Sequence, residues 1–465
     1  MTRDTMISAA FQLMYAAPMS QNRLLKDTKQ HLFRSSIGRI LSDGLHQPIL
    51  GRNDHVIGDG GSLRHLPFFE EVAAHEEHQA EWRAAAAGLV TLRLVDAWIE
   101  GGPEVVAPES MGVTAVLKAI DAMDEGSTLP GLLRAIVQAL QAAAPGEMRE
   151  VFPRILAYGR GLEYEAKWFL ALDVYDTVVA HAHPIEEHEA ASAAHQRRGA
   201  SFRTIGRHDD ALAAYATASA IAEAAGDMIG VLRAKTGAAN IAVARGDLPK
   251  ADRAFESIAA EASRLGLGDQ QAHALDSRAA VAGHRGEYER AVRFAYEALQ
   301  VSSEAAERDR ILNNIGTAFH LLGLRSAARD AFLVLSATAQ EQYVRWTAML
   351  SLMTLAAEDG SEVAFCQLRG GFHVAELPPE VKVDYFLHLG RAYRALEHDD
   401  LAGIAFAKAI ELSEHYRLNR QLFEAERELR TPRPIIHTAS MHHPQEDLTY
   451  VTDAIHAIRA HALVE

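Results

Sequence analysis

Two groups of histidine and acidic residues have the composition of metal sites. In the segment HEEH, His75 and His78 are three residues apart, so a helix would place both imidazoles on one face. A zinc protease motif spaces its two histidines four apart, and no third ligand is identifiable here. A second group, His181, His183 and His188, lies in a segment that links two expected helices. We interpret both groups as solvated polar residues and predict no metal site.

Other residues whose side chains could act in catalysis also lack the neighbouring residues that catalysis needs. The segment GDGG (58–61) could cradle a phosphate, but it has neither the P-loop lysine nor the strand–turn–helix setting of a dinucleotide site, so we interpret it as a loop. No serine has the glycines of a nucleophile elbow. The single cysteine, Cys366, lies among apolar residues, which indicates a core position. Paired carboxylates such as Glu186 and Glu187 occupy helical or linking segments. We predict no catalytic residue and no cofactor.

Arginine and asparagine residues recur at positions that helical spacing would place on one surface. An asparagine amide can pair with both the donor and the acceptor of an extended backbone, and a guanidinium binds a carboxylate through two hydrogen bonds. We therefore predict a binding surface for a protein or peptide segment that carries acidic groups. The alternative is that these are ordinary solvated helix residues. The predicted surface consists of Arg160, Arg203, Arg233, Asn240, Arg310, Asn313, Thr317, Arg391 and Arg394.

Composition narrows the classes of partner and compartment. The 46 Lys and Arg residues are outnumbered by 62 Asp and Glu residues, and the resulting net charge of −16 opposes binding to phosphate backbones. Nucleic acid is therefore not an expected partner. One cysteine excludes an internal disulfide and indicates a reducing compartment, so we expect a cytoplasmic protein. The sequence shows neither a signal peptide nor an apolar run of about 20 residues, so we expect no membrane span.

An internal repeat supplies the elements that would position the predicted surface. An alanine is followed four residues later by an aromatic residue in most units, and three residues after that by a small or apolar residue. A small residue usually lies twelve residues before the alanine. We call the alanine position the later anchor of each unit, and it is occupied by Ala171, Ala211, Ala251, Ala291, Ala328, Phe365 and Ala402. We call the small-residue position the earlier anchor, and it is occupied by Gly159, Gly199, Ala239, Ala279, Gly316, Met353 and Gly390.

The spacing of the two anchors predicts a helical hairpin in every unit. A small residue on the first helix lets the second helix approach closely, and the aromatic side chain fills the space beside it. A glycine between the anchors, such as Gly206 or Gly246, allows the positive φ that ends the first helix and reverses the chain. Seven such units follow one another, although the unit around Phe365 is degenerate. We therefore predict an all-α protein built as a solenoid.

The repeated residues resemble the tetratricopeptide repeat over residues 150–415. This resemblance implies a right-handed α-solenoid of about seven hairpins whose first helices line a concave, partner-binding groove. The period exceeds the usual 34 residues, and the longer links suggest extended helices like those of bacterial sensor and regulator members. The family's usual proline at the end of each unit is mostly missing. Some members clamp a C-terminal carboxylate with lysine and asparagine. Asn240 matches one of those places, whereas Thr236 and Ser277 depart from the pattern.

Both ends of the chain lie outside the repeat. Residues 1–150 read as a helical cap or a small fused domain, with helices expected near 68–100, 109–123 and 129–143. Residues 151–430 form the expected solenoid. Residues 431–465 begin with the helix-breaking TPRP and end in an amphipathic helix with a stripe from Leu448 to Ala462. We expect this helix to cap the last hairpin, since a solenoid must cover its terminal unit.

The sequence thus favours a non-enzymatic scaffold that holds a partner segment in its groove, as a regulator or an assembly factor. One alternative is a sensor of signal peptides that changes its superhelical pitch on binding. A second alternative is an enzyme with its active site in residues 1–150.

Overall fold

The computed structural model describes residues 64–76, 78–107, 110–124, 126–144, 147–430 and 447–462. Within these ranges the regular elements are helices and there is no strand, which confirms the all-α prediction. The GDGG segment, the TPRP segment and most of MHHPQED lie outside the described residues. The chain forms two units, Met1–Arg154 and Ile155–Glu465, and each is considered by itself.

The first unit is helical, and its expected long helix near 68–100 is two helices. The chain is extended at His75 (φ −117°, ψ 161°), and the side-chain oxygen of Gln79 accepts a hydrogen bond from the Glu76 amide at 2.7 Å. These local bonds stabilise a break between the two helices. The described elements of this unit are α4 (Leu66–Ala74), α5 (Ala80–Gly101), η4 (Pro103–Val106), α6 (Met111–Asp121) and α7 (Leu129–Ala142).

The HEEH segment is the connection between α4 and α5, so its histidines do not share a helix face as the sequence suggested. His75 lies 3.5 Å from Glu71, and His78 lies 3.5 Å from Glu76. The described residues contain no group of three or more histidine, cysteine or acidic side chains that could hold a metal ion. The two imidazoles therefore pair locally with carboxylates.

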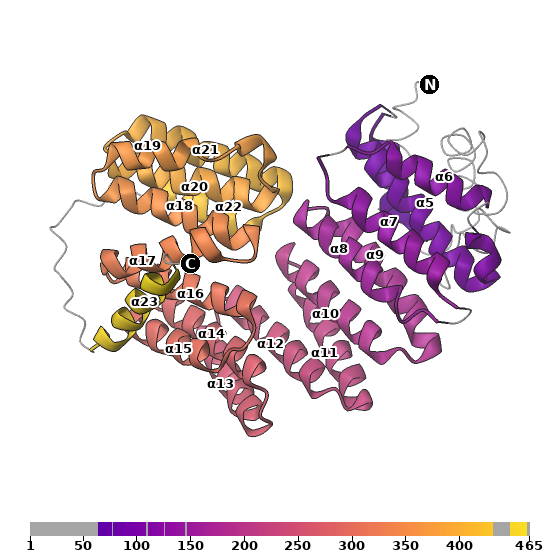
Figure 1. The fold of residues 1–465 in the computed structure, drawn as a ribbon, viewed down its shortest axis with the longest axis horizontal. Helices are drawn as coiled ribbons and strands as arrows, with labels where there is room; N and C mark the ends of the chain where they lie inside the picture. The colour runs from indigo at the N-terminus through magenta and orange to yellow at the C-terminus, as the bar shows by residue number, and fades with distance from the viewer. Residues whose placement is uncertain are drawn as a thin grey trace, which may run out of the picture. The chain divides into compact units, whose positions relative to one another are not determined.

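Helical hairpins in register make up the second unit (Figure 1). Their first helices are α8 (Phe152–Tyr164), α10 (His188–Thr204), α12 (Met228–Ala244), α14 (Gly268–His284), α16 (Ala305–Leu321), α18 (Gln342–Glu358) and α20 (Pro379–Ala395). Their second helices are α9 (Trp168–Ala182), α11 (His208–Ala225), α13 (Leu248–Arg264), α15 (Tyr288–Val301), α17 (Arg325–Thr338), α19 (Glu362–Gly370) and α21 (Asp399–Tyr416). Two single helices follow, α22 (Asn419–Arg430) and α23 (Thr449–Ala462).

The turns inside the hairpins have the geometry expected from their glycines. Gly206 and Gly246 have φ values of 80° and 77°, a conformation that costs a glycine little. After Gly206, the amide of Arg207 donates to the carbonyl of Phe202 at 2.8 Å, which closes the end of α10 as a Schellman turn does. The next helix of each hairpin can then start within three residues.

The first helices form the inner side of the curved array. Successive first helices contact one another from α10 through α20. In the described part of the chain, successive second helices show no comparable series of contacts. Elements on the inner side of a curved stack lie closest together, so the first helices line the concave face. This is the face on which the sequence placed the binding surface.

One histidine is held neutral inside the array. His195, on α10, is only 6% exposed, and Arg198 Nη1 lies 3.2 Å from its Nδ1, which must therefore be the unprotonated acceptor. Burial lowers the pKa of His195 to about 4, and the charges of Arg198 and His183 act in the same direction. In an unfolded chain the same imidazole titrates near pH 6.5.

This lowered pKa predicts acid sensitivity. Below about pH 6.5 the imidazole of His195 is protonated in the unfolded chain but stays neutral in the folded protein. The free energy of unfolding therefore falls as the pH drops toward 4. Between pH 7 and 5, the free energy of unfolding of the wild type should fall by on the order of 1 kcal/mol more than that of His195→Gln. Urea unfolding at a series of pH values measures this difference. Identical pH dependence in the two proteins would contradict the assignment of His195 as neutral.

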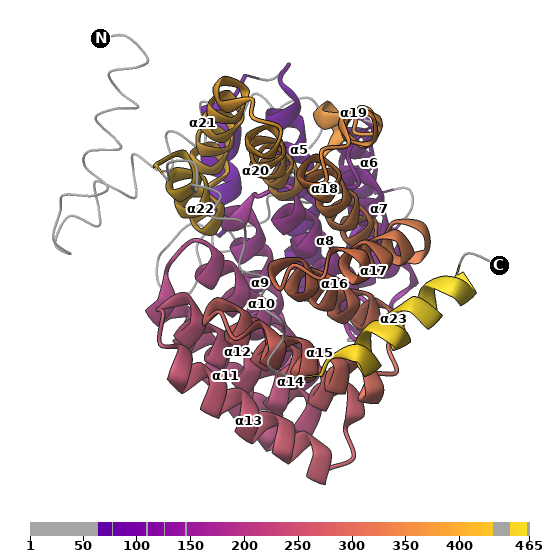
Figure 2. The same ribbon diagram turned by 90° about the vertical axis from the view of Figure 1, so that its left-hand side faces the viewer.

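The C-terminal helix α23 packs against α17 in the middle of the array (Figure 2). Leu448, Val451 and Ile455 are buried in the core of the central hairpins. His456 (3.1 Å) and Arg459 both pair with Asp330, a carboxylate on α17 that is 8% exposed. The expectation that this helix caps the last hairpin is therefore corrected. Asp330 and the apolar side chains around it provide the complementary surface, and α17 lies on the convex side.

The docking of α23 can be tested with a substitution on its buried face. Ile455→Asp places a carboxylate among apolar side chains, where each buried Leu, Val or Ile contributes roughly 1.5–3 kcal/mol. We expect the amides of 449–462 to exchange with deuterium at least tenfold faster, while the hairpins stay folded. Ala457→Asp is the matched control because Ala457 is exposed. Unchanged exchange in Ile455→Asp would show that α23 is held by other contacts.

Cys366 is exposed, which corrects the expectation of a core position. Its neighbour Phe365 is buried and contacts Tyr393 at 5.6 Å between ring centroids. A rotation of about 100° per helical residue then turns Cys366 outward.

Among the described residues, no helix has the length and apolar character needed to cross a bilayer.

Candidate functional site

The groove depends on close packing between small and aromatic residues within each hairpin. A Cβ atom added to Gly159 would lie 2.3 Å from the ring of Tyr175, and one added to Gly199 would lie 2.7 Å from the ring of Tyr215. Each aromatic residue follows its glycine by sixteen positions, as the two anchors require. Only a glycine allows the ring to approach this closely. The repeated unit is thus a helical hairpin with the packing that its two anchors predict.

The same contact recurs along the array of hairpins. Gly316 faces Phe332 at 2.8 Å, and Gly390 faces Phe406 at 2.5 Å, measured from an added Cβ atom. Tyr215 also fills the space beside Gly237 on the next hairpin, where an added Cβ atom would lie 2.2 Å from the ring. These rings therefore fix the distance between helices within a hairpin and, at Tyr215, between hairpins.

The central groove brings together three basic side chains from successive first helices. Arg233 on α12, His273 on α14 and Arg310 on α16 lie six residues before the small anchor of their units, so they share one repeat position. Burial lowers the pKa of His273, and the charges of Arg310 and Arg233 lower it further. Two residues of the predicted surface are thus near one another, on either side of a neutral imidazole.

Acidic residues lie beneath this basic row. Glu307, 5% exposed, forms an ion pair with Arg310 and lies 3.3 Å from His273. Asp276 accepts hydrogen bonds from the Asn314 amide at 2.8 and 3.0 Å, and burial raises its pKa. Arg310 is still 50% exposed. Arg233 is exposed and has no carboxylate partner among the described residues. Arg233 therefore carries a positive charge that no described carboxylate pairs with.

Polar groups that could hold a peptide backbone lie on the same helices. Asn240 on α12 is half-buried, and its amide has no hydrogen-bond partner among the described side chains and backbone groups. Asn313 on α16 has a buried Oδ1 atom without a partner in the same part of the chain. Thr317 is exposed and donates to the Asn313 carbonyl at 2.9 Å. Two amides that lack partners fit the donor and acceptor pattern of an extended strand.

The remaining predicted residues are less available. Arg391 binds Glu424 and Glu428 at 2.6 and 3.0 Å, and Arg394 binds Glu428 at 2.9 Å, so both guanidinium groups connect α20 to α22. Both guanidinium groups are thus already paired with carboxylates of the chain itself. Arg203 interacts with the Tyr215 hydroxyl. Arg160, on α8, is exposed.

Sequence reasoning missed His273 and Asp276. The signal for His273 was available, because counting six residues back from the anchors Ala239, Ala279 and Gly316 selects Arg233, His273 and Arg310 together. The role of Asp276 was not visible, since it depends on the side chain of Asn314 from the next hairpin. Ser277, which departs from the carboxylate-clamp pattern, donates to the His273 carbonyl of its own helix at 2.9 Å.

Solved structures of other helical repeat proteins are similar to this chain at low identity. The apo form of the quorum sensor NprR from B. thuringiensis is 13% identical, with 82% of this chain and 99% of that chain covered and a TM-score of 0.40. The Rap protein complexed with Competence and Sporulation Factor is 14% identical, with coverage of 74% and 98% and a TM-score of 0.40. The P58(IPK) TPR domain is 16% identical, with coverage of 72% and 98% and a TM-score of 0.20. No protein family and no curated protein sequence matches the chain.

Proposed function

We propose that this protein is a cytoplasmic, non-enzymatic regulator that binds an extended peptide or protein segment on its concave face. The observation that carries the proposal is the row Arg233, His273 and Arg310 on three successive first helices. An acidic side chain or a terminal carboxylate of the segment would bind Arg233, with Arg310 as the second basic group. The acidic partner follows from Arg233, which has no carboxylate of its own in the described structure.

Asn240 and Asn313 would hold the backbone of the same segment. Their amides flank the basic row and can exchange hydrogen bonds with a strand in either direction. The segment would therefore cross α12, α14 and α16, and leave α20 and α22, whose charges are already paired, outside the contact.

The proposal is tested by capturing a partner with the wild type and with a variant that lacks the Arg233 and Arg310 side chains. Tagged wild-type protein and the Arg233→Ala/Arg310→Ala variant are used to capture partners from the native lysate. A partner retained by the wild type and lost by the variant is then synthesised as overlapping peptides for calorimetric titration. Retention of every captured partner by the variant would contradict a binding site in the groove.

A further inference from the structure

The first and last hairpins of the array contact each other away from the groove. The Trp168 indole N–H donates to the Tyr416 carbonyl at 3.2 Å, and the Arg417 guanidinium lies over the Phe169 ring at 5.0 Å from its centroid. Asn419 Nδ2 lies 3.2 Å from the position of an added Cβ atom on Gly206. These contacts join residues that are far apart in the sequence, 248 positions in the case of Trp168 and Tyr416.

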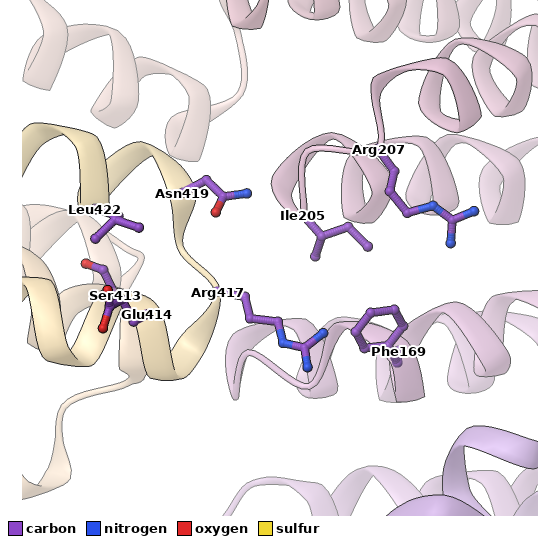
Figure 3. Close-up of a pocket in the computed structure, with 8 residues that line it drawn as sticks. All are labelled: Phe169, Ile205, Arg207, Ser413, Glu414, Arg417, Asn419 and Leu422. Atoms are coloured by element: carbon purple, nitrogen blue, oxygen red, sulfur yellow. The ribbon is translucent and has the colours of Figure 1, made fainter. Parts of the chain in front are cut away.

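A pocket of about 370 Å³ lies at this contact (Figure 3). Ligand pockets in proteins begin at about this volume. Figure 3 shows apolar side chains from both ends, with the Arg417 guanidinium beside Phe169. The first hairpins contribute Phe169, Ile205 and Arg207, and the last helices contribute Ser413, Glu414, Arg417, Asn419 and Leu422.

Arg417 occupies a backbone conformation that favours glycine. Its φ is 57°, and it ends α21 at the place where Gly226 and Gly266 end α11 and α13 with φ values of 72° and 70°. Glycine would adopt this backbone conformation without strain. Arg417 is exposed, and it has no carboxylate partner in the described ranges. The aromatic ring beneath it holds the guanidinium plane while its N–H edges stay available.

Two further polar groups in the pocket are unsatisfied within the described residues. Ser413 is 0% exposed, and its hydroxyl has no hydrogen-bond partner there. The Asn419 amide likewise makes no hydrogen bond to the described structure. Arg207, by contrast, is engaged elsewhere: its Nε atom binds Asp210 at 2.8 Å, and its guanidinium lies over the Phe202 ring at 4.8 Å from the centroid.

We propose that this pocket binds a small organic monocarboxylate with an apolar body, and that the bound ligand holds the first and last hairpins together. The Arg417 guanidinium and the Asn419 amide suit a carboxylate, and Phe169, Ile205 and Leu422 suit an apolar body. Glu414 on the same rim opposes a multiply charged phosphate. A ligand that touches both ends favours the closed array, because it binds the open array less well.

Calorimetry with 3-phenylpropionate and hexanoate tests the site, with 3-phenylpropanamide and hexanamide as neutral controls of the same shape. We expect each acid to bind at least tenfold more tightly than its amide. Arg417→Gly should lose more than tenfold in affinity for the acids and yet melt at the same or a higher temperature, since glycine suits this backbone. Arg264→Gln, which alters an exposed arginine on α13, should bind as the wild type does.

Small-angle scattering tests the closure. The radius of gyration of the wild type should fall on addition of 3-phenylpropionate, and that of Arg417→Gly should not. Equal affinity for acids and amides, absence of binding by both acids, or wild-type binding by Arg417→Gly would overturn the ligand site. Binding without a change in the radius of gyration would overturn its effect on closure. The Arg233→Ala/Arg310→Ala variant should respond as the wild type, which separates this site from the groove.

Discussion

Tyr215→Ala and Phe255→Ala should each lower the free energy of unfolding by about 3–5 kcal/mol. Both side chains are buried, at 5% and 0% exposure. The Tyr215 ring fills the space beside Gly199 and Gly237, so its loss opens a cavity between two hairpins that no neighbouring Cβ atom can fill. Phe255 occupies the equivalent place in the next unit, opposite Ala239.

The damage should extend beyond one hairpin, because a repeat array is held together by the interfaces between neighbouring units. Thermal and urea unfolding measure the loss, and hydrogen exchange shows whether units next to the cavity open with it. Phe423→Ala is the matched control, since Phe423 on α22 is 68% exposed. If both core variants melted at the wild-type temperature, the register of the hairpins would be wrong.

Replacing Arg233 and Arg310 with Ala should weaken a groove-bound acidic segment by more than tenfold. Each lost hydrogen bond to a charged group accounts for about 1.5–3 kcal/mol. The larger part should come from Arg233, because Arg310 already pairs with Glu307. Titration of the two single variants and the double variant separates these contributions, with Arg264→Ala as an exposed control on α13.

Salt distinguishes the charged contacts from the backbone contacts. Screening shortens the reach of exposed charges to about 8 Å at physiological ionic strength, so wild-type affinity should fall as salt rises. The arginine variant should show a smaller salt dependence. Asn240→Ala and Asn313→Ala should weaken binding and keep the wild-type salt dependence, since amides hold the neutral backbone. A segment that binds all these variants with wild-type affinity and salt dependence must lie elsewhere.

The hairpins could be predicted from the sequence because their determinants are local. A glycine sixteen residues before an aromatic residue, as in Gly199 and Tyr215, fixes both the helix spacing and the register. Residues spaced by the period then fall at one repeat position, which is why Arg233 and Arg310 both lie on first helices, α12 and α16. The break at His75 was missed because it depends on the side chain of Gln79 and not on a glycine or proline.

Contacts between distant parts of the chain could not be predicted. Arg391 and Arg394 look like groove residues until the carboxylates of Glu424 and Glu428 are placed beside them. The docking of α23 depends on Asp330, which is more than one hundred residues away in the sequence. The strained backbone of Arg417 gives no signal in the sequence, since the residue type is common at helix ends.

The central claim is that the partner segment lies on the first helices, and site-specific photo-crosslinking tests it most directly. A photo-reactive amino acid is placed at Thr317, an exposed residue of α16 in the groove, or at Ala260, an exposed residue of the second helix α13. Each protein is irradiated with the captured partner, and the linked peptide is identified by mass spectrometry. We expect one acidic segment of the partner to link to position 317 and none to position 260. Linkage at position 260 alone would contradict the groove as the binding site.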